Sequence, residues 1–138
     1  MNDINEWNRE IIEKFRANGG VVGEPFNGIP LLLLHNTGAK SGETRINPLA
    51  YQPVEGGYAI FGSMGGAPKN PAWFHNLVAN PEAEVEVGDR REKVVARVVS
   101  GAERTRIWEK QKAEVPQFAE YERKTDREIP VIVLEPAA

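Results

Sequence analysis

Hydrophobic positions recur along this chain with two periods, one typical of helices and one typical of strands. Near the N-terminus, Ile4, Trp7, Ile11, Ile12 and Phe15 follow helical spacing, with acidic and basic residues between them. This pattern predicts an amphipathic helix within residues 1–19. Shorter apolar or alternating runs, bounded by turns that contain glycine or proline, predict strands at residues 31–36, 45–52, 58–63, 82–87, 91–100 and 129–134.

Three more segments are predicted to be helical. Asn70 followed by Pro71 is a favourable helix start, because Asn caps the first turn and Pro suits the first helical position. Residues 102–114 have a helical composition. Phe118 and Tyr121 lie three residues apart, which places them on one face of a shorter helix.

The order of these elements predicts the fold class. Strands with helices interspersed, but without regular β-α-β alternation, indicate a mainly β protein of the α+β class, built as a barrel with helices outside. We expect one domain over residues 1–138, since no repeat or linker interrupts the chain. A hydrophobic content of 41% and a charged content of 27% suit a domain with a packed core and a solvated surface.

Charge and cysteine content exclude several classes of partner and chemistry. The net charge of −3 argues against nucleic acid, which needs a basic surface. With no cysteine, there is no disulfide, thiolate metal site or cysteine nucleophile. The N-terminal residues lack the apolar stretch of a signal peptide, so we expect a cytoplasmic protein. The predicted N-terminal helix has two interpretations: a lid over the barrel, or a face that leans on a membrane surface.

Two loops concentrate the residues that suit a ligand. In residues 37–45, glycines expose backbone N–H groups, and Lys40, Ser41 and Arg45 can donate to anionic oxygens. This loop lacks the order of a Walker motif, so it is either an ordinary turn or an anion cradle. In residues 63–73, glycines allow a flat ligand to approach the backbone closely. Trp73 is either core or part of that site, and Asn76 lies one helical turn further on.

The histidine, glutamate and serine residues elsewhere in the sequence do not form a pattern that predicts a catalytic site. His35 and His75 are far apart and lack a third ligand, so we expect no metal. The alternating Glu82, Glu84 and Glu86 indicate a solvated strand face. Ser63 is not part of a nucleophile elbow. No side chain stands out as a nucleophile or general base, which is expected when a cofactor carries the chemistry.

The order and spacing of several motifs together resemble the deazaflavin-dependent nitroreductase family. The motifs are Leu33-Leu34-His35-Asn36-Thr37-Gly38-Ala39-Lys40-Ser41-Gly42, Arg45-Ile46-Asn47-Pro48-Leu49, Ser63-Met64-Gly65-Gly66, Asn70-Pro71-Ala72-Trp73-Phe74-His75-Asn76-Leu77 and Thr125-Asp126-Arg127-Glu128-Ile129-Pro130-Val131. The likeness covers nearly the whole chain. It implies a split β-barrel of the FMN-binding-protein-like kind and the use of coenzyme F-420, an 8-hydroxy-5-deazaflavin with a phospholactyl-oligoglutamate tail.

The resemblance also implies a set of site residues and a reaction. The anionic tail would lie on Lys40, Ser41 and Arg45, and hydride transfer would reduce a hydrophobic quinone or activated enone. Ser63 would donate to the acceptor oxygen, and the proton would come from Ser63, Tyr121 or solvent. The implied cofactor-binding residues are Ala39, Lys40, Ser41, Arg45, Ile46, Asn47, Pro48, Leu49, Ala50, Phe61, Gly62, Ser63, Met64, Ala72, Trp73, Phe74, His75, Asn76 and Phe118.

The chain departs from the family pattern at two groups of positions. Ala39 stands where many relatives have Arg, and Met64 where some have Lys, which removes charge near the tail. Ala50, Val115 and Phe118 stand where the nitroimidazole-activating member has tyrosines, so we expect a different acceptor pocket. Two alternatives stay open: a related split-barrel enzyme that uses FMN, and a non-catalytic carrier of the deazaflavin.

Overall fold

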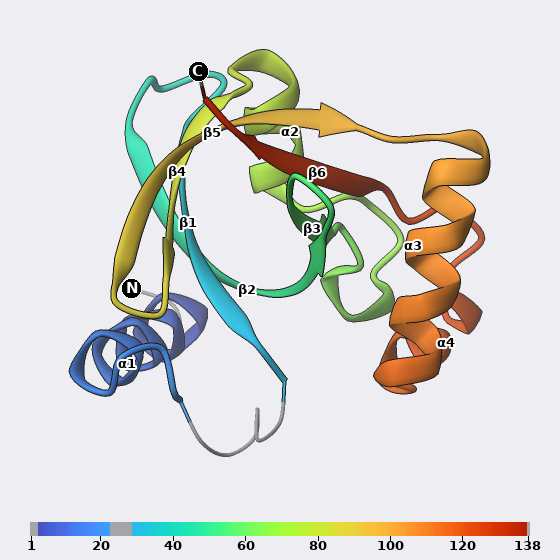
Figure 1. Cartoon of the computed structure of the whole chain (residues 1–138), viewed down its shortest axis with the longest axis horizontal. Coiled ribbons are helices and arrows are strands. Elements are labelled where there is room, and N and C mark those ends of the chain that lie inside the picture. The colour runs from blue at the N-terminus through green and yellow to red at the C-terminus, as the bar shows by residue number, and fades with distance from the viewer. Residues whose placement is uncertain (1–2, 23–28, 138) are drawn as a thin grey trace.

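Six strands and four α-helices make up the computed structural model, which describes residues 3–22 and 29–137 (Figure 1). In chain order the elements are α1 (Asp3–Ala17), β1 (Leu31–Thr37), β2 (Thr44–Val54), β3 (Gly57–Phe61), the 3₁₀ helix η1 (Met64–Gly66), α2 (Ala72–Ala79), β4 (Glu82–Val87), β5 (Arg90–Val98), α3 (Gly101–Glu114), α4 (Gln117–Arg123) and β6 (Val131–Pro136). Every predicted helix and strand is present, with ends shifted by a few residues.

The strands close into an antiparallel barrel in the order β1-β2-β3-β6-β5-β4, with β4 pairing back to β1. Alternate side chains point into the barrel. Leu32, Leu34, Val85, Ile132 and Leu134 belong to this inner core and are fully buried. The mainly β class with helices outside the barrel is therefore confirmed.

The unbroken apolar runs of β1 and β6 reflect burial on both faces of the strand. In β1, Leu32 and Leu34 lie in the inner core, whereas Leu31 and Leu33 pack outside against Ile11 and Phe15 of α1. In β6, Val131 and Val133 belong to an outer cluster with Trp108 of α3 and Phe118 of α4. In Figure 1, α1 and the α3–α4 pair lie on different sides of the barrel.

The described apolar residues of α1 face the barrel. Ile11 and Phe15 are 4% and 1% exposed. Their burial agrees with a helix that covers the barrel, and it leaves no part of these two side chains for a membrane surface. Within the described residues, no helix combines the length and the hydropathy needed to cross a bilayer.

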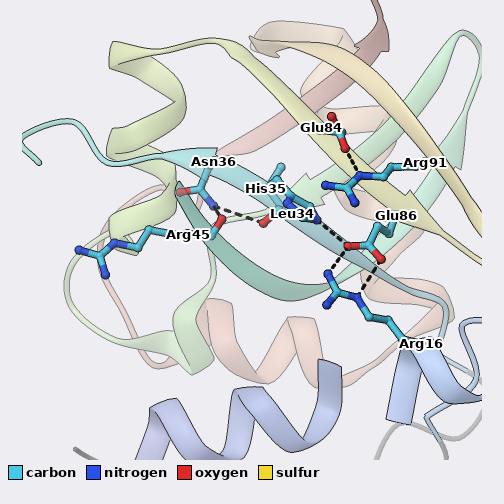
Figure 2. A network of polar contacts seen from close by, with 8 residues as sticks. All are labelled: Arg16, Leu34, His35, Asn36, Arg45, Glu84, Glu86 and Arg91. Atoms are coloured by element: carbon cyan, nitrogen blue, oxygen red, sulfur yellow. Dashed lines mark hydrogen bonds and ion pairs between the residues drawn. The ribbon is translucent and has the colours of Figure 1, made fainter. Parts of the chain in front are cut away.

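An ion-pair network fastens α1 to β4 (Figure 2). Arg16 donates from Nε and Nη2 to the two carboxylate oxygens of Glu86, at 3.1 and 2.7 Å, and Nε2 of His35 lies 2.5 Å from Glu86 Oε2. The hydrogen bonds from Arg16, with a smaller contribution from His35, lower the pKa of Glu86 from 4.5 to about 2. The prediction of a solvated face is therefore wrong at Glu86, because the strand face is covered there by α1.

We expect Glu86→Gln to destabilise the protein by about 1–2 kcal/mol, because Arg16 and His35 lose their anionic partner although Arg16 is half exposed. The folded pKa lies below the unfolded value, so the stabilisation from Glu86 is present above pH 4.5 and is lost as the pH falls toward 2. Urea unfolding between pH 2 and 7 should show that the free energy of unfolding falls less steeply with decreasing pH in the variant than in the wild type.

The matched control is Glu84→Gln on the same strand. Among the described side chains Glu84 pairs only with Arg91, and both of these side chains are more exposed than Glu86. We expect a change of less than about 0.5 kcal/mol. Equal losses in the two variants would contradict the special role of Glu86.

The start of α2 differs from the prediction. Pro71, in extended conformation, occupies the N-cap position, and the helix begins at Ala72. The side chain of Asn70 makes no capping bond; its Oδ1 instead accepts a hydrogen bond of 2.7 Å from Nη1 of Arg127. The Asn70 side chain, which the local sequence predicted to cap the helix, thus binds Arg127, a residue distant in sequence. Similarly, the strand predicted to reach Ser63 ends at Phe61, and Ser63 is the N-cap residue of η1.

Candidate active site

The two glycine-containing loops meet at one cleft of about 1230 Å³. Its walls come from the loop between β1 and β2, from β2 and the end of β3, from η1 and α2, and from α1 and α4. The lining residues are Asn8, Gly38, Ala39, Lys40, Ser41, Arg45, Ile46, Asn47, Pro48, Leu49, Ala50, Phe61, Ser63, Met64, Pro71, Ala72, Trp73, His75, Asn76, Phe118 and Tyr121.

Most of the predicted site residues therefore lie together. Gly62 and Phe74 do not line the cleft: Gly62 is buried beside Pro130, and Phe74 packs against the inner core. Trp73 is 6% exposed within the inner core and also borders the cleft, so its two interpretations do not exclude each other. Asn8 of α1 was not predicted, because nothing in the local pattern indicates that this helix reaches the site.

The loop between β1 and β2 forms a basic, exposed rim of the cleft. Its backbone is turned by hydrogen bonds from Gly38 N–H to the Glu43 carbonyl, at 2.8 Å, and from Gly42 N–H to the Gly38 carbonyl, at 2.9 Å. Arg45 lies 3.3 Å from the Glu43 carboxylate, with both side chains more than half exposed. Lys40 has no ion-pair partner in the described part of the chain. The rim can therefore attract an anionic group.

A chain of asparagine amides holds this loop against α2. Asn36 is 1% exposed and donates from Nδ2 to Asn47 Oδ1 at 3.0 Å. Asn76 donates from Nδ2 to Asn36 Oδ1 at 2.8 Å, and its own Oδ1 accepts the Ala39 N–H at 2.9 Å. Asn76 thus positions the loop with both ends of its amide. The buried Asn36 was not predicted as a site residue. Its position, a polar residue at the end of an apolar strand, was the feature of the sequence that could have indicated it.

Two hydroxyl groups border the cleft from different elements. Ser63 is 7% exposed, and within residues 3–22 and 29–137 its hydroxyl has no hydrogen-bond partner. Tyr121 of α4 likewise has a hydroxyl without a partner in the described chain, and its ring packs edge-on against Phe118 at 5.3 Å between centroids. Both hydroxyls are therefore available to donate to a ligand.

An aromatic cluster forms the wall of the cleft next to Tyr121. The ring centroids of Phe61 and Phe118 are 5.5 Å apart, and each packs on Trp108, at 5.8 and 6.2 Å. Trp108 itself does not reach the cleft. It supports the two phenylalanines that do, so the shape of this wall depends on α3 as well as on the lining residues.

The described residues contain no group of three His, Asp or Glu side chains placed to hold a metal. His35 is paired with Glu86 on the barrel surface, whereas His75 lies on α2 at the cleft.

Comparison with known proteins identifies the family. The sequence matches the model described as F420H(2)-dependent quinone reductase over residues 7–136. The chain belongs to this family. It is 38% identical over 124 residues to the F420H(2)-dependent quinone reductase Rv1261c of Mycobacterium tuberculosis (strain H37Rv), a match that covers 87% of this chain and 83% of that protein.

Solved structures agree with this assignment. The F420-H2 dependent reductase FDR-A superposes with a TM-score of 0.71 and 43% identity, over 77% of this chain and 94% of that one. A chain described as a domain-swapped dimer gives a TM-score of 0.73 and 36% identity, over 96% and 100% of the two chains. The predicted split β-barrel and the predicted class of F-420-dependent reductase are confirmed.

Coenzyme F-420 is the cofactor of this family, and the cleft suits it. The group has a flat ring and a long anionic tail. The cleft offers half-buried apolar residues such as Pro48 and Leu49 for a ring, and the exposed basic rim at Lys40 and Arg45 for an anion. Its volume of about 1230 Å³ exceeds that of a typical small-molecule pocket, which leaves room for a second ligand beside the cofactor.

Proposed function

We propose that this F-420-dependent reductase reduces quinones and activated enones in the cleft, with cofactor and acceptor held there together. When bound, the reduced deazaflavin supplies the hydride. The observation that carries the proposal is the combination of a basic rim, apolar walls and, at Ser63, a hydroxyl that has no partner in the described chain although the residue is only 7% exposed. This combination suits an anionic tail, a flat ring and the polar atom of an acceptor.

Lys40, Ser41 and Arg45 would hold the anionic tail. Lys40 and Arg45 contribute two positive charges, and the Ser41 hydroxyl, which accepts the Glu43 N–H at 3.1 Å, keeps its proton for donation. Ala39 contributes only backbone, and its N–H is already bound to Asn76. Binding of the anionic tail would therefore depend on these two cations at the exposed rim.

The remaining lining residues would enclose the ring and keep water away from it. Exclusion of water strengthens each electrostatic interaction inside the cleft. Pro48 and Leu49 are half-buried on β2, and Trp73 is held rigidly by the inner core. The other lining residues proposed for this role are Ile46, Asn47, Ala50, Phe61, Met64, Ala72, His75, Asn76 and Phe118.

Ser63 would donate its hydroxyl proton in a hydrogen bond to the acceptor oxygen, where negative charge develops. A donor that is already in place needs no reorganisation during the reaction. Tyr121 has the second available hydroxyl, and it or solvent would deliver the proton that completes reduction. Ala50 and Phe118 make the acceptor side apolar, which favours quinones and polycyclic enones over nitroimidazoles.

We expect Ser63→Ala to lower kcat with menadione by about 10²-fold, because one preorganised donor is lost. The dissociation constant of coenzyme F-420 should change by less than about threefold, since the tail is held elsewhere. Ser100→Ala is the matched control: Ser100 is exposed and makes no capping bond at the start of α3. Full activity of Ser63→Ala would remove Ser63 from the reaction.

The direct test of the function uses the purified protein with coenzyme F-420 and, separately, with FMN, followed by fluorescence. Menadione or cyclohexenone is then added to the reduced complex. Oxidation that is faster than in a protein-free control supports the proposal for that acceptor. Binding of FMN alone would contradict it in favour of a flavin enzyme, and deazaflavin binding without turnover would favour a carrier.

A further inference from the structure

The segment between β3 and α2, residues 62–71, carries Ser63 and lies tightly against the end of α4 and the chain that connects α4 to β6. Gly62 donates its N–H to the Pro130 carbonyl at 2.9 Å, and a Cβ built on Gly62 would lie 2.7 Å from Pro130 Cγ. Gly66 has φ +86°, and a Cβ there would lie 2.9 Å from the Tyr121 carbonyl oxygen. The backbone of η1 therefore approaches α4 as closely as only glycine allows.

Arg127 is the polar connection between these two segments. Its Nη2 donates to the Ser63 carbonyl at 2.9 Å, its Nε to the Ala67 carbonyl at 3.0 Å, and its Nη1 to Asn70 Oδ1 at 2.7 Å. One guanidinium thus spans the first turn, the middle and the end of the loop. Because its donors have a planar, fixed arrangement, the three acceptors are fixed relative to one another.

The charge of Arg127 has an unusual environment. Within the described residues no carboxylate lies at ion-pair distance from it, and burial alone lowers the pKa of Arg127 from its usual value. A half-buried guanidinium that is held by carbonyl groups instead of a carboxylate keeps its positive field. That field acts at the wall where Ser63 borders the cleft.

The loop also contains a conformation that needs support. Met64, next to Ser63, has φ +48°, although it is not glycine, and its side chain is 50% exposed at the cleft. Left-handed backbone at such a residue persists only where the surrounding structure holds it. Hydrogen bonds from Gly66 N–H to the Ser63 carbonyl and from Ala67 N–H to the Met64 carbonyl close the turn, and Arg127 anchors two of its carbonyls.

We propose that Arg127 is a positioning residue for the reduction step: it holds residues 63–70 so that the Ser63 hydroxyl faces the acceptor, and its charge favours the negative acceptor oxygen. This inference rests on the proposed function of Ser63. It predicts that Arg127 acts on turnover and not on the cofactor tail, which would lie on the separate rim at Lys40 and Arg45.

The test combines amide hydrogen exchange with kinetics on the full chain. In Arg127→Met, exchange within residues 63–70 is expected to rise about tenfold or more, because three charge-assisted bonds are lost, while residues 38–43 stay unchanged. The kcat with menadione is expected to fall by about tenfold or more, with the F-420 dissociation constant within about threefold of wild type. Arg127→Lys keeps the positive charge but not the planar set of donors, so its exchange rates and kcat should lie between those of the wild type and those of Arg127→Met.

The matched control is Arg123→Met. Arg123 lies at the end of α4, is 64% exposed and pairs only with Glu120 among the described side chains. The Arg123→Met substitution removes the same charge from the same region, and both the amide exchange in residues 63–70 and kcat should stay at wild-type values. A fall in kcat equal to that of Arg127→Met would overturn the proposal.

A double-mutant cycle separates positioning of Ser63 from a general structural role. If Arg127 acts mainly through Ser63, Arg127→Met lowers kcat by a clearly smaller factor in the Ser63→Ala background than in the wild type, because only the effect of its charge on the acceptor oxygen remains. If the two losses multiply in full, the proposal is overturned. Unchanged exchange in residues 63–70 would also overturn it. A wild-type protein without quinone turnover would contradict the proposed function instead, and exchange would still decide whether Arg127 holds this loop.

Discussion

The variant that combines Lys40→Ala and Arg45→Ala is expected to bind coenzyme F-420 about 30-fold more weakly than the wild type. Each lost cation at an exposed site removes about 1 kcal/mol of attraction for an anionic tail, and 1.4 kcal/mol is a factor of ten in affinity. Both side chains are exposed at the rim of the cleft, so the fold should be unaffected. Fluorescence titration with the cofactor measures the change.

Salt provides a second readout for the same variant. The affinity of the wild type should fall between 50 and about 500 mM salt, since exposed charges are screened, and the affinity of the variant should fall less. The control combines Arg106→Ala and Lys110→Ala, which removes two exposed cations from α3, away from the cleft. An equal loss of affinity in that control would show that net charge, and not the rim, attracts the tail.

Trp108→Ala is expected to cause the largest loss of stability, about 3–5 kcal/mol. The side chain is 2% exposed and packs on Phe61 and Phe118. Its Nε1 donates to Glu122 Oε2 at 2.5 Å, the main reason that the pKa of Glu122 is lowered, and Arg104 and Lys112 each lie 5.7 Å from the ring centroid. Truncation leaves a cavity behind the aromatic wall of the cleft.

Urea unfolding followed by circular dichroism measures this loss. Trp108→Phe is the milder variant, since it keeps a ring for Phe61 and Phe118 but removes the donor to Glu122, and it should cost about 1–2 kcal/mol. Val98→Ala, at an exposed position of β5, serves as the control with a change below about 0.5 kcal/mol. If Trp108→Ala were no worse than Val98→Ala, the aromatic cluster would not support the fold.

The barrel was predictable because its strands carry their signal locally. In β4, alternation of Glu and apolar residues places Val85 and Val87 in the core. In β1, an apolar run without alternation indicates burial on both faces, but only the structure assigns those faces to the inner core and to α1. The local pattern thus defines an element, whereas the element that covers it depends on the closed barrel.

The candidate site was predictable in part, for a different reason. Glycine-containing loops at strand ends indicate where a ligand can approach, and the cleft is bordered by Lys40 and Trp73 as expected. The identity of the cofactor was not contained in spacing or charge; it came from resemblance to a family. Asn36 and Arg127 were not recognised, since neither lines the cleft and each only hydrogen-bonds a residue that does.

The sequence by itself determined the helices, the strands, the mainly β class and the two loops that meet at the cleft. All of these depend on spacings of two to four residues, or on residues such as glycine whose conformational freedom is intrinsic. The tertiary structure alone decided the partners of the polar side chains. Arg16 reaches Glu86 across 70 positions and Arg127 reaches Ser63 across 64, because closure of the barrel, and not distance along the chain, brings a donor to its acceptor.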